Sequence, residues 1–366
     1  APAEIANYPF TTIDANVGVA FYRTECPCRN LPVRCGNCQD GARFVGVNLI
    51  DVAGLVPDAH KGKALGNQFL DHLRQADAIL HIVDASGSTD SEGNPVGVGS
   101  HDPRSDIAFL EYEMAMWVVG ILDKHWGKLQ RHAQSKNYSI HQGVAEVLTG
   151  LKISPEDVRD AELTARIDLV HADAKDLEKF CREITRISKP MVPVGNKVDL
   201  APENLIDALK QNRFLFASAA GELALRNAAQ AGLISYLPGD PSFTVLKGDS
   251  LSPQQKAGLD RIAALMKKFG GTGVQQAVDH VIRELLELIV VYPVEDEHKF
   301  ADSKGRVLPD AFLMKKGSTP RDLAFMVHTD IGKGFLYAVD ARTRMRIKDT
   351  HHLSHGDIVR IISTAK

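Results

Sequence analysis

The sequence has little net charge, few aromatic residues and no long apolar run. Of its 366 residues, 6% are aromatic. The positive and negative charges nearly cancel to a net charge of −3, so the overall electrostatic field of the protein does not attract nucleic acid. Apolar runs stay below the roughly 18 residues of a membrane span, and no secretory signal pattern is present, so we expect a cytoplasmic location and no membrane partner. The 44% hydrophobic content suffices for the cores of two or three domains.

A P-loop is also missing from the sequence. That motif, Gly-x-x-x-x-Gly-Lys-[Ser/Thr], cradles the β- and γ-phosphates of a nucleotide with its backbone N–H groups and its lysine. Gly-Lys pairs occur at residues 62–63, 127–128 and 332–333, and neither Ser nor Thr follows any of them. Without such a loop most of the hydrogen bonds to the phosphates would be absent, and nucleotide affinity should be poor.

The most informative motif that is present is Asn196-Lys197-Val198-Asp199, which follows an apolar run at 190–195 that predicts a buried strand. The carboxylate of Asp199 only accepts hydrogen bonds. Guanine offers it two donors, the ring N–H and the exocyclic amine, whereas adenine presents a lone pair at the ring position, and a site built for two bonds rejects the analogue that lacks them. The motif therefore indicates guanine recognition; a surface turn after a strand is the alternative.

Two further segments carry residues suited to Mg²⁺ and a terminal phosphate. Residues 45–50 predict a strand that ends at Asp51, which can hold Mg²⁺ through water, and the backbone N–H of Gly54 can then reach a terminal phosphate. Near the start of the chain, Thr12 can place its hydroxyl on Mg²⁺ and its backbone N–H on the γ-phosphate. These residues predict a magnesium site.

A fourth segment follows a strand predicted at residues 214–216, where the chain enters small residues. There the backbone N–H groups of Ser218 and Ala219 can meet the carbonyl oxygen of guanine. The four segments follow one another in the order that a GTP-binding domain needs. We therefore expect an α/β fold with a doubly wound sheet, whose nucleotide loops lie at the carboxyl ends of the strands.

With these motifs the chain resembles the Obg-related GTPases of the YchF type, and it is close to their archaeal members. The resemblance covers essentially the whole chain and is carried by residues 6–12, 51–56, 66–70, 196–199 and 312–320. It implies a P-loop-NTPase-like domain with a coiled-coil-like helical insertion and a C-terminal TGS domain. In this family the P-loop directly precedes the segment that begins here with Ala1, so we expect it upstream of that residue.

Two positions refine what the resemblance implies about chemistry. Bacterial and eukaryotic members of the family often replace the motif's Asp by Glu and prefer ATP, whereas this chain keeps Lys197 and Asp199, which predicts guanine selectivity. Ras-like proteins orient the attacking water with a glutamine directly after the Asp-x-x-Gly glycine, but Leu55 occupies that position here. We expect slow hydrolysis with Thr12 and Gly54 as catalytic residues, and water positioned by the backbone, a monovalent cation or a partner such as the ribosome.

The chain divides into three predicted domains. Residues 1–99 and 188–290 form the GTP-binding domain, in which 78–85 predict a further buried strand. Residues 100–187, with their spaced apolar positions, form an inserted helical hairpin. Residues 291–366 alternate short apolar stretches with turns, which fits a small α+β domain of the β-grasp type. This last domain resembles the TGS domain.

Two helix predictions fall in the second half of the chain. Residues 253–268 and 274–290 have helical patterns and are expected to belong to the GTP-binding domain. In the TGS-like domain, Thr319 is expected to cap a helix that has Pro320 in its first position and Asp322 three residues after the cap.

The TGS-like domain differs in charge from the rest of the chain. It contains 13 Lys and Arg against 10 Asp and Glu, a net of +3, while the remaining residues carry 30 against 36, a net of −6. Its candidate phosphate contacts are Lys315, Lys316, Arg321, Arg342, Arg344, Arg346 and Lys348. A solvated basic face is the alternative, but the family resemblance favours contact with RNA or the ribosome through this domain and the helical insertion.

Four of the five cysteines are close together, at Cys26, Cys28, Cys35 and Cys38, in a C-x-C-x6-C-x-x-C pattern. Four thiolates at such spacing, with Gly and Pro turns among them, can close a tetrahedral Zn²⁺ site at the tip of a hairpin. In a cytosolic protein a metal is favoured over a disulfide. A structural Zn²⁺ is one interpretation, and free or redox-active thiols are the other; Cys181 is expected to be buried in a helix.

The leading hypothesis is a monomeric, GTP-hydrolysing switch that acts in translation or ribosome biology. GTP and Mg²⁺ would order the Thr12 loop and the segment after Gly54, and hydrolysis would release them. The competing hypothesis is an RNA- or ribosome-binding protein whose nucleotide domain is a non-hydrolysing scaffold, which the missing P-loop and Leu55 favour.

Overall fold

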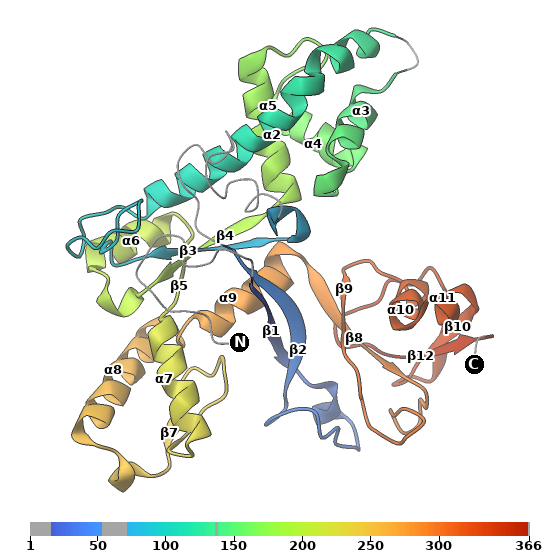
Figure 1. Cartoon of the computed structure of the whole chain (residues 1–366). Helices are drawn as coiled ribbons and strands as arrows, with labels where there is room; N and C mark the ends of the chain where they lie inside the picture. Colours follow the sequence, from blue (N-terminus) through green and yellow to red (C-terminus); the bar gives the residue numbers. More distant parts are fainter. Residues whose placement is uncertain (1–15, 53–71, 136–137, 365–366) are drawn as a thin grey trace. The chain divides into compact units, whose positions relative to one another are not determined.

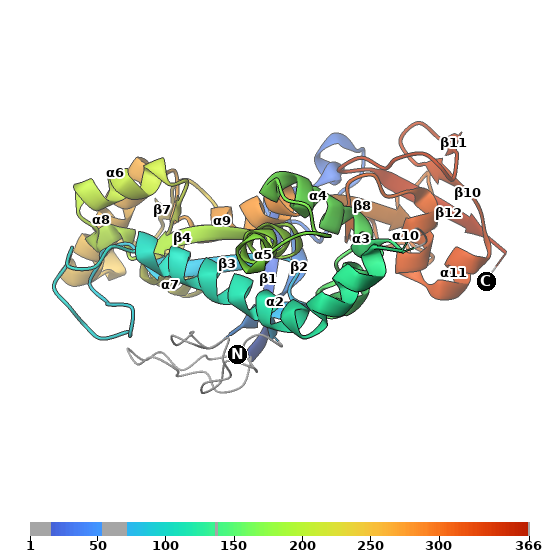
Figure 2. The same cartoon turned by 90° about the horizontal axis from the view of Figure 1, so that it is seen from above.

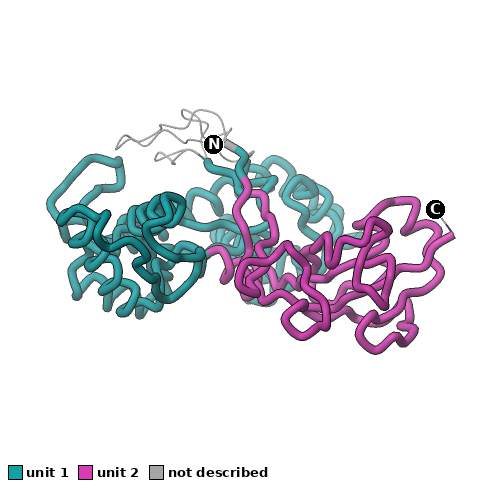
Figure 3. The backbone as a smooth tube through the Cα atoms, turned by 90° about the horizontal axis from the view of Figure 1, so that it is seen from below, with its two compact units in different colours: residues 1–18, 49–277 teal, residues 19–48, 278–366 magenta. Residues whose placement is uncertain are grey.

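Figures 1 and 2 show a computed structural model of the chain, which describes residues 16–52, 72–135 and 138–364. The chain forms two compact units: unit 1 contains residues 1–18 and 49–277, and unit 2 contains residues 19–48 and 278–366 (Figure 3). Each unit has its own hydrophobic clusters. The domain boundaries expected from the sequence stay a prediction.

A parallel sheet forms the centre of unit 1. Its described strands are β3 (Ile79–Asp84), β4 (Met191–Asn196) and β5 (Leu215–Phe216), in the order β3-β4-β5. Their apolar runs predict all three. Val192 and Val194 of β4 point to one face of the sheet and are buried there, while Met191 and Pro193 on the other face are half-buried.

Helices that follow these strands in the sequence complete the part of unit 1 that contains the parallel sheet. They are α6 (Glu203–Gln211), α7 (Ala219–Gln230), α8 (Pro253–Phe269) and the start of α9 (Val274–His280), whose last three residues belong to unit 2, with a short two-stranded sheet of β6 (Ile234–Ser235) and β7 (Thr244–Val245). Helix α8 confirms the helix expected at 253–268. It begins with a capping box in which Ser252 and Gln255 satisfy each other's backbone N–H groups, and Gly270 ends it in the left-handed conformation.

The helical insertion contains four helices: α2 (Arg104–Ala133), α3 (Ile140–Val147), α4 (Pro155–Ala165) and α5 (Ala174–Ser188). The expected hairpin corresponds to α2 and α5, which pack against each other, while α3 and α4 lie toward the far end of α2 (Figures 1 and 2). Its core includes the fully buried Leu122 and Phe180. Cys181 is buried there as predicted.

A five-stranded mixed sheet forms the centre of unit 2. Its strands are β8 (Leu288–Val294), β9 (Phe312–Lys315), β10 (Phe335–Asp340), β11 (Met345–Ile347) and β12 (Ile358–Ser363), in the order β11-β10-β12-β8-β9. Only the β8–β12 pair is parallel. Helices α10 (Pro320–Val327) and α11 (Thr329–Lys333) follow β9, and Leu323 and Ala324 of α10 pack in one cluster with strand residues. The expected α+β, β-grasp architecture is thus confirmed.

One helix prediction is wrong at its end. The segment predicted as a helix over 274–290 is α9 followed by a π-helical turn at Val281–Leu285, and β8 begins at Leu288. The run Leu-Ile-Val-Val-Tyr-Pro-Val carries no polar residue to fix its period, so a buried strand and a buried helix look alike in the sequence. Pairing of β8 with β9 and β12 decides for the strand.

Strands β1 (Asn16–Glu25) and β2 (Ala42–Asp51) form a two-stranded sheet of their own. The chain connecting them, which contains a 3₁₀ turn at Pro27–Asn30, carries the four clustered cysteines. This confirms that they lie at a hairpin tip. Among the described residues, no helix is both long and apolar enough to cross a membrane.

Candidate nucleotide-binding site

The carboxyl ends of the three parallel strands place the predicted base-reading residues at one edge of the sheet. Asp84, the last residue of β3, lies opposite Asn196, the last residue of β4, and Gly195 lies opposite Phe216 of β5. Because the strands are parallel, the loops that follow them emerge on the same side. The Asn196–Asp199 motif and Ser218 therefore belong to one loop cluster, as the sequence predicts.

Direct hydrogen bonds join the two base-reading loops. The side-chain Oδ1 of Asn196 accepts from the backbone N–H of Ala219 (3.0 Å), and the N–H of Val198 donates to the carbonyl of Ala217 (3.2 Å). Ser218 is buried and caps α7 by accepting from the N–H of Gly221 (3.2 Å). The asparagine thus fixes one loop against the other.

The backbone N–H groups of Ser218 and Ala219 already have partners. Ser218 donates to the carbonyl of Thr272 (2.8 Å), and Ala219 donates to Asn196. A guanine carbonyl oxygen would reach the Ala219 N–H only by sharing or exchanging that bond. The role expected for these two amides stays a prediction.

Asp199 is exposed at the end of the sheet. It lies in a 3₁₀ turn, Val198–Leu200, and it is exposed, with no hydrogen bond or ion pair among the described residues. Its neighbour Lys197 adopts a left-handed backbone conformation with φ of 59°. A residue other than glycine is uncommon there, and such positions gather at ligand sites. The turn presents the carboxylate outward beside Asn196.

Asp84 holds the motif's lysine in place. Its Oδ2 lies 2.8 Å from Lys197 Nζ and also accepts from the hydroxyls of Ser88 (2.8 Å) and Thr89 (2.7 Å), while its Oδ1 accepts from the backbone N–H of Ser86 (2.9 Å). Burial acts to raise the pKa of Asp84, but the Lys197 ammonium and the surrounding hydroxyls outweigh it and hold that pKa well below its usual range. The carboxylate is therefore ionised and fixes Lys197 electrostatically.

The sequence interpretation missed Asp84. A signal was available, because an acid at the end of a predicted strand is followed by Ser86, Ser88 and Thr89, whose short hydroxyl side chains can turn back onto it. The sequence alone does not reveal the strand register, and that register places Asp84 opposite Asn196.

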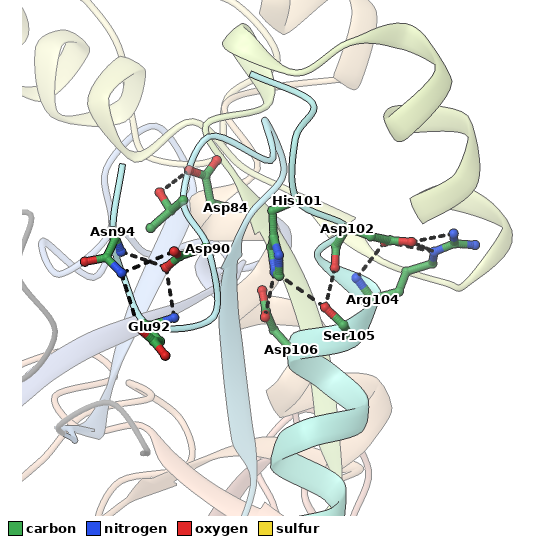
Figure 4. Close-up of polar contacts among 10 residues, drawn as sticks. Asp84, Asp90, Glu92, Asn94, His101, Asp102, Arg104, Ser105 and Asp106 are labelled. Atoms are coloured by element: carbon green, nitrogen blue, oxygen red, sulfur yellow. Dashed lines mark hydrogen bonds and ion pairs between the residues drawn. The ribbon is translucent and has the colours of Figure 1, made fainter. Parts of the chain in front are cut away.

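The loop after β3 is held by separate groups of polar contacts, shown in Figure 4. Asp90 accepts from the backbone N–H groups of Glu92 (2.9 Å) and Asn94 (2.8 Å), which closes a tight turn. Where the loop joins α2, His101 Nε2 lies 2.8 Å from Asp106 Oδ1. These contacts give the Asp84 side of the site a fixed frame.

The predicted magnesium residues are only partly described. Asp51 ends β2 and is exposed, as expected for an acid at the end of a strand. Thr12 and Gly54, like Leu55, lie outside the described residues. The magnesium site stays a prediction, but an exposed carboxylate fits the oxygen ligands that Mg²⁺ prefers.

The four clustered cysteines belong to unit 2 and form a separate group. Their sulfur atoms all lie within 4.8 Å of one another, and no disulfide joins them. Cys26, Cys28 and Cys35 are buried in one hydrophobic cluster with residues of β8. The four side chains converge, and the structural Zn²⁺ stays a prediction.

Family models match three successive parts of the chain. Residues 1–110 match a model described as 50S ribosome-binding GTPase, residues 194–296 match the G4 motif-containing domain of YGR210-like Obg-like GTPases, and residues 304–363 match the TGS domain. The second model spans the Asn196–Asp199 motif, and the third spans the helix capped by Thr319.

Individual relatives match along nearly the full chain. An uncharacterized GTP-binding protein of Methanocaldococcus jannaschii is 45% identical, covering 100% of this chain and 94% of its own length. The crystal structure of a GTP binding protein from Pyrococcus horikoshii OT3 is 40% identical with a TM-score of 0.75, covering 95% of this chain and 93% of that one.

A more distant relative is the ribosome-binding ATPase YchF of Bacillus subtilis, which is 27% identical over 92% of this chain and 81% of its own length. The two closer matches and the three family models agree on the family. The chain belongs to the YchF/Obg-like GTPase family, with a GTPase domain followed by a C-terminal TGS domain.

Proposed function

We propose that this chain binds guanine nucleotides at the β3-β4-β5 edge and hydrolyses GTP slowly, as a Mg²⁺-dependent switch linked to the ribosome. The observation that carries the proposal is the exposed carboxylate of Asp199, which has no partner among the described residues and lies beside an asparagine that already joins two loops. A site with this geometry offers two acceptor positions to a purine that presents two donors.

Each described residue of the edge has its own part in this proposal. Asp199 accepts from the ring N–H and the exocyclic amine of guanine. Lys197, fixed by Asp84, lies where its side chain can cover the face of the base, and Asn196 keeps the two loops together. None of these contacts involves the reacting phosphate, so they set affinity and selectivity more than rate.

Thr12, Asp51 and Gly54 are assigned to the phosphate end. Mg²⁺ held by Thr12 and Asp51 would neutralise charge on the phosphates, and the backbone N–H of Gly54 would bind the terminal phosphate. Leu55, in the position where Ras-like proteins have glutamine, has no polar group with which to orient water. Slow intrinsic hydrolysis follows, and a ribosomal partner is the proposed activator.

The proposed link to the ribosome is supported by the names of related proteins and by the positive charge of the C-terminal part of the chain. A relative is named a ribosome-binding ATPase, and the model matching residues 1–110 is described as a ribosome-binding GTPase. The basic side chains of the C-terminal part, such as Lys315, Arg344 and Lys348, are exposed. We assign the partner contact to the TGS domain and to the helical insertion, residues 100–187.

Nucleotide selectivity is the first test. Fluorescent GTP and ATP analogues are titrated into the chain with Mg²⁺ present, and we expect GTP to bind at least tenfold more tightly, because ATP would leave Asp199 facing another acceptor. Equal affinity for the two nucleotides, or a preference for ATP as in the relatives named ATPases, would contradict the guanine assignment.

Hydrolysis separates the two candidate functions. Phosphate release from GTP is followed with and without ribosomes. A slow basal rate that ribosomes increase supports the switch. Nucleotide binding with no hydrolysis in either condition supports the alternative, which Leu55 favours: an RNA- or ribosome-binding protein whose nucleotide domain is a scaffold.

A further inference from the structure

The cysteine cluster, Cys26, Cys28, Cys35 and Cys38, has the dimensions of a four-thiolate metal site. The sulfurs of Cys26 and Cys35 are 3.5 Å apart, and those of Cys28 and Cys38 are 3.6 Å apart. A disulfide would require about 2.05 Å. In a tetrahedral site with Zn–S bonds of about 2.3 Å the sulfurs are separated by roughly 3.8 Å, which is close to the separations found here.

The backbone around the cluster directs N–H groups toward two of the sulfurs. The N–H of Cys28 donates to the sulfur of Cys26, and the N–H of Asn37 donates to the sulfur of Cys35. Gly36 has a φ of 62°, which lets the second turn place its N–H groups around the sulfur. The N–H of Cys26 donates to the carbonyl of Gly41 (2.8 Å), which closes the base of the hairpin tip where β1 ends and β2 begins.

Two buried polar groups near the cluster have no hydrogen-bond partner in the part of the chain that the structure describes. These are the Nη1 of Arg43 and the hydroxyl of Tyr292, and the Arg43 guanidinium lies 6.0 Å from the centre of the Tyr292 ring. Arg43 is 6% exposed and forms no ion pair with the described residues; its one hydrogen bond there is from Nη2 to the carbonyl of Pro309. Tyr292 packs in the same hydrophobic cluster as three of the cysteines.

A buried cation without an anion is costly. Four neutral thiols give Arg43 no compensating charge, whereas four thiolates around Zn²⁺ carry a net charge of −2. A metal-loaded cluster would therefore provide the anion that this part of the core lacks. This observation is independent of the spacing of the sulfurs, and it points to the same ligand.

We propose that the cysteine cluster binds one Zn²⁺ and that the bound metal fastens the turns of the β1–β2 hairpin tip together, in the form that packs against the core of unit 2. Binding releases the four thiol protons and transfers no electrons. All four positions are protein ligands, so the site is closed and structural. The tip is joined to the same core by the side chain of Asn37, which donates to the carbonyl of Leu308 (3.3 Å).

The proposed site is independent of the nucleotide, so its test does not depend on GTP binding. The full chain, purified from zinc-supplemented medium, is analysed by elemental mass spectrometry, and one zinc per chain is expected. Metal-depleted protein reloaded with Co²⁺ should show the absorption of tetrahedral cobalt with thiolate charge-transfer bands. Protein with neither zinc nor cobalt, or an intact mass that reveals disulfides, would overturn the proposal.

Matched variants locate the metal. Cys28→Ser and Cys38→Ser should each lose most of the zinc and weaken the cobalt charge-transfer bands, because each removes one thiolate. Cys181→Ser is the control, since Cys181 is buried in α5 of unit 1 and packs in a different hydrophobic cluster. Equal loss from all three variants would show that the metal is not held by the cluster.

The fastening role has its own readout, which does not require any variant to fold. Removing zinc from the wild-type chain with a chelator should speed proteolysis between residues 26 and 41, and readdition of zinc should restore protection. A chain that releases its zinc with no change in protection of this segment would contradict the fastening role.

Discussion

The ionised carboxylate of Asp84 gives the base-reading edge a fixed charge at its centre. It is surrounded by one ammonium and several hydroxyls, and its side chain is 11% exposed, so the contact with Lys197 is less screened than a surface pair. Lys197 in turn keeps an uncommon backbone conformation beside Asp199. Asp84 thus holds Lys197 in place, and in the proposed site it would be a positioning residue.

Replacing Asp84 with Asn should lower the free energy of unfolding by about 2 kcal/mol at pH 7, since the hydrogen bonds to a charged group are removed. The pKa of Asp84 is depressed in the folded state, so its contribution is fully present above the unfolded value near pH 4. It is lost as the pH falls through the folded value. The difference between wild type and Asp84→Asn in urea unfolding should therefore shrink toward pH 2.

The control for that series is Asp77→Asn. Asp77 pairs with Lys152 at 2.8 Å, but the side chains are 67% and 65% exposed, so we expect a loss well below 1 kcal/mol. If the two substitutions cost the same at pH 7, Asp84 has no special role.

The carboxylate of Asp199 makes a sharper prediction about selectivity. Asp199→Asn should reduce GTP affinity by roughly 100-fold, because one acceptor becomes a donor that faces the donors of guanine. Xanthine has a carbonyl in place of the exocyclic amine, and the new amide can donate to it. The variant should therefore bind XTP more tightly than the wild type does, as measured by competition against a fluorescent nucleotide.

Asp207→Asn is the matched control, because Asp207 is an exposed acid on α6 that pairs with Lys210. It should leave both affinities unchanged. If Asp199→Asn lowered the affinity for GTP without raising the affinity for XTP, the carboxylate would stabilise the loop and would not hydrogen-bond the base.

At the scale of elements, capping residues were read well from the sequence. The capping box predicted at Thr319 is present: the Thr319 hydroxyl accepts from the N–H of Asp322 (3.3 Å), and the Asp322 carboxylate accepts from the N–H of Thr319 (2.8 Å). Such signals depend on four neighbouring residues, so they survive without knowledge of the fold. The strand at Leu288–Val294 was misread in part, because its identity depends on pairing with distant strands.

The Thr319 box yields a stability prediction. Thr319→Ala should lower the free energy of unfolding by about 1 kcal/mol, because the first turn of α10 loses its side-chain acceptor. Thr319→Ser retains the hydroxyl and should cost only a few tenths of this. Thermal unfolding of both variants followed by circular dichroism measures the difference, and equal melting temperatures for Ala and Ser would show that the box contributes nothing.

At the scale of the whole molecule, local motifs predict which strand ends lie together but not which distant side chains contact them. Asn196 and Ser218 were found from strand ends, since parallel strands bring their carboxyl ends to one edge. The contact of Asp84 with Lys197 joins residues 113 positions apart, and the union of the cysteine hairpin with β8 joins segments more than 200 positions apart. Only the register and packing of the folded chain bring such groups together.

The exposed basic side chains near β11 predict that unit 2 binds RNA. Arg344 and Lys348 flank β11 (Met345–Ile347), and both are exposed without an ion pair among the described residues. Exchanging both for Glu should weaken binding to ribosomal RNA or ribosomes. It should also reduce the slope of log affinity against log salt by roughly one for each phosphate that the variant no longer neutralises.

Two lysines on α8 provide the matched control for this charge reversal. Lys256 and Lys267 are exposed in unit 1, and exchanging both for Glu changes the net charge of the chain by the same amount. If the RNA binds locally to unit 2, only the Arg344 and Lys348 pair alters affinity and slope, as measured by co-sedimentation over a series of salt concentrations. Equal weakening by both pairs would mean that overall charge governs binding, and the basic side chains of unit 2 would then be a solvated face.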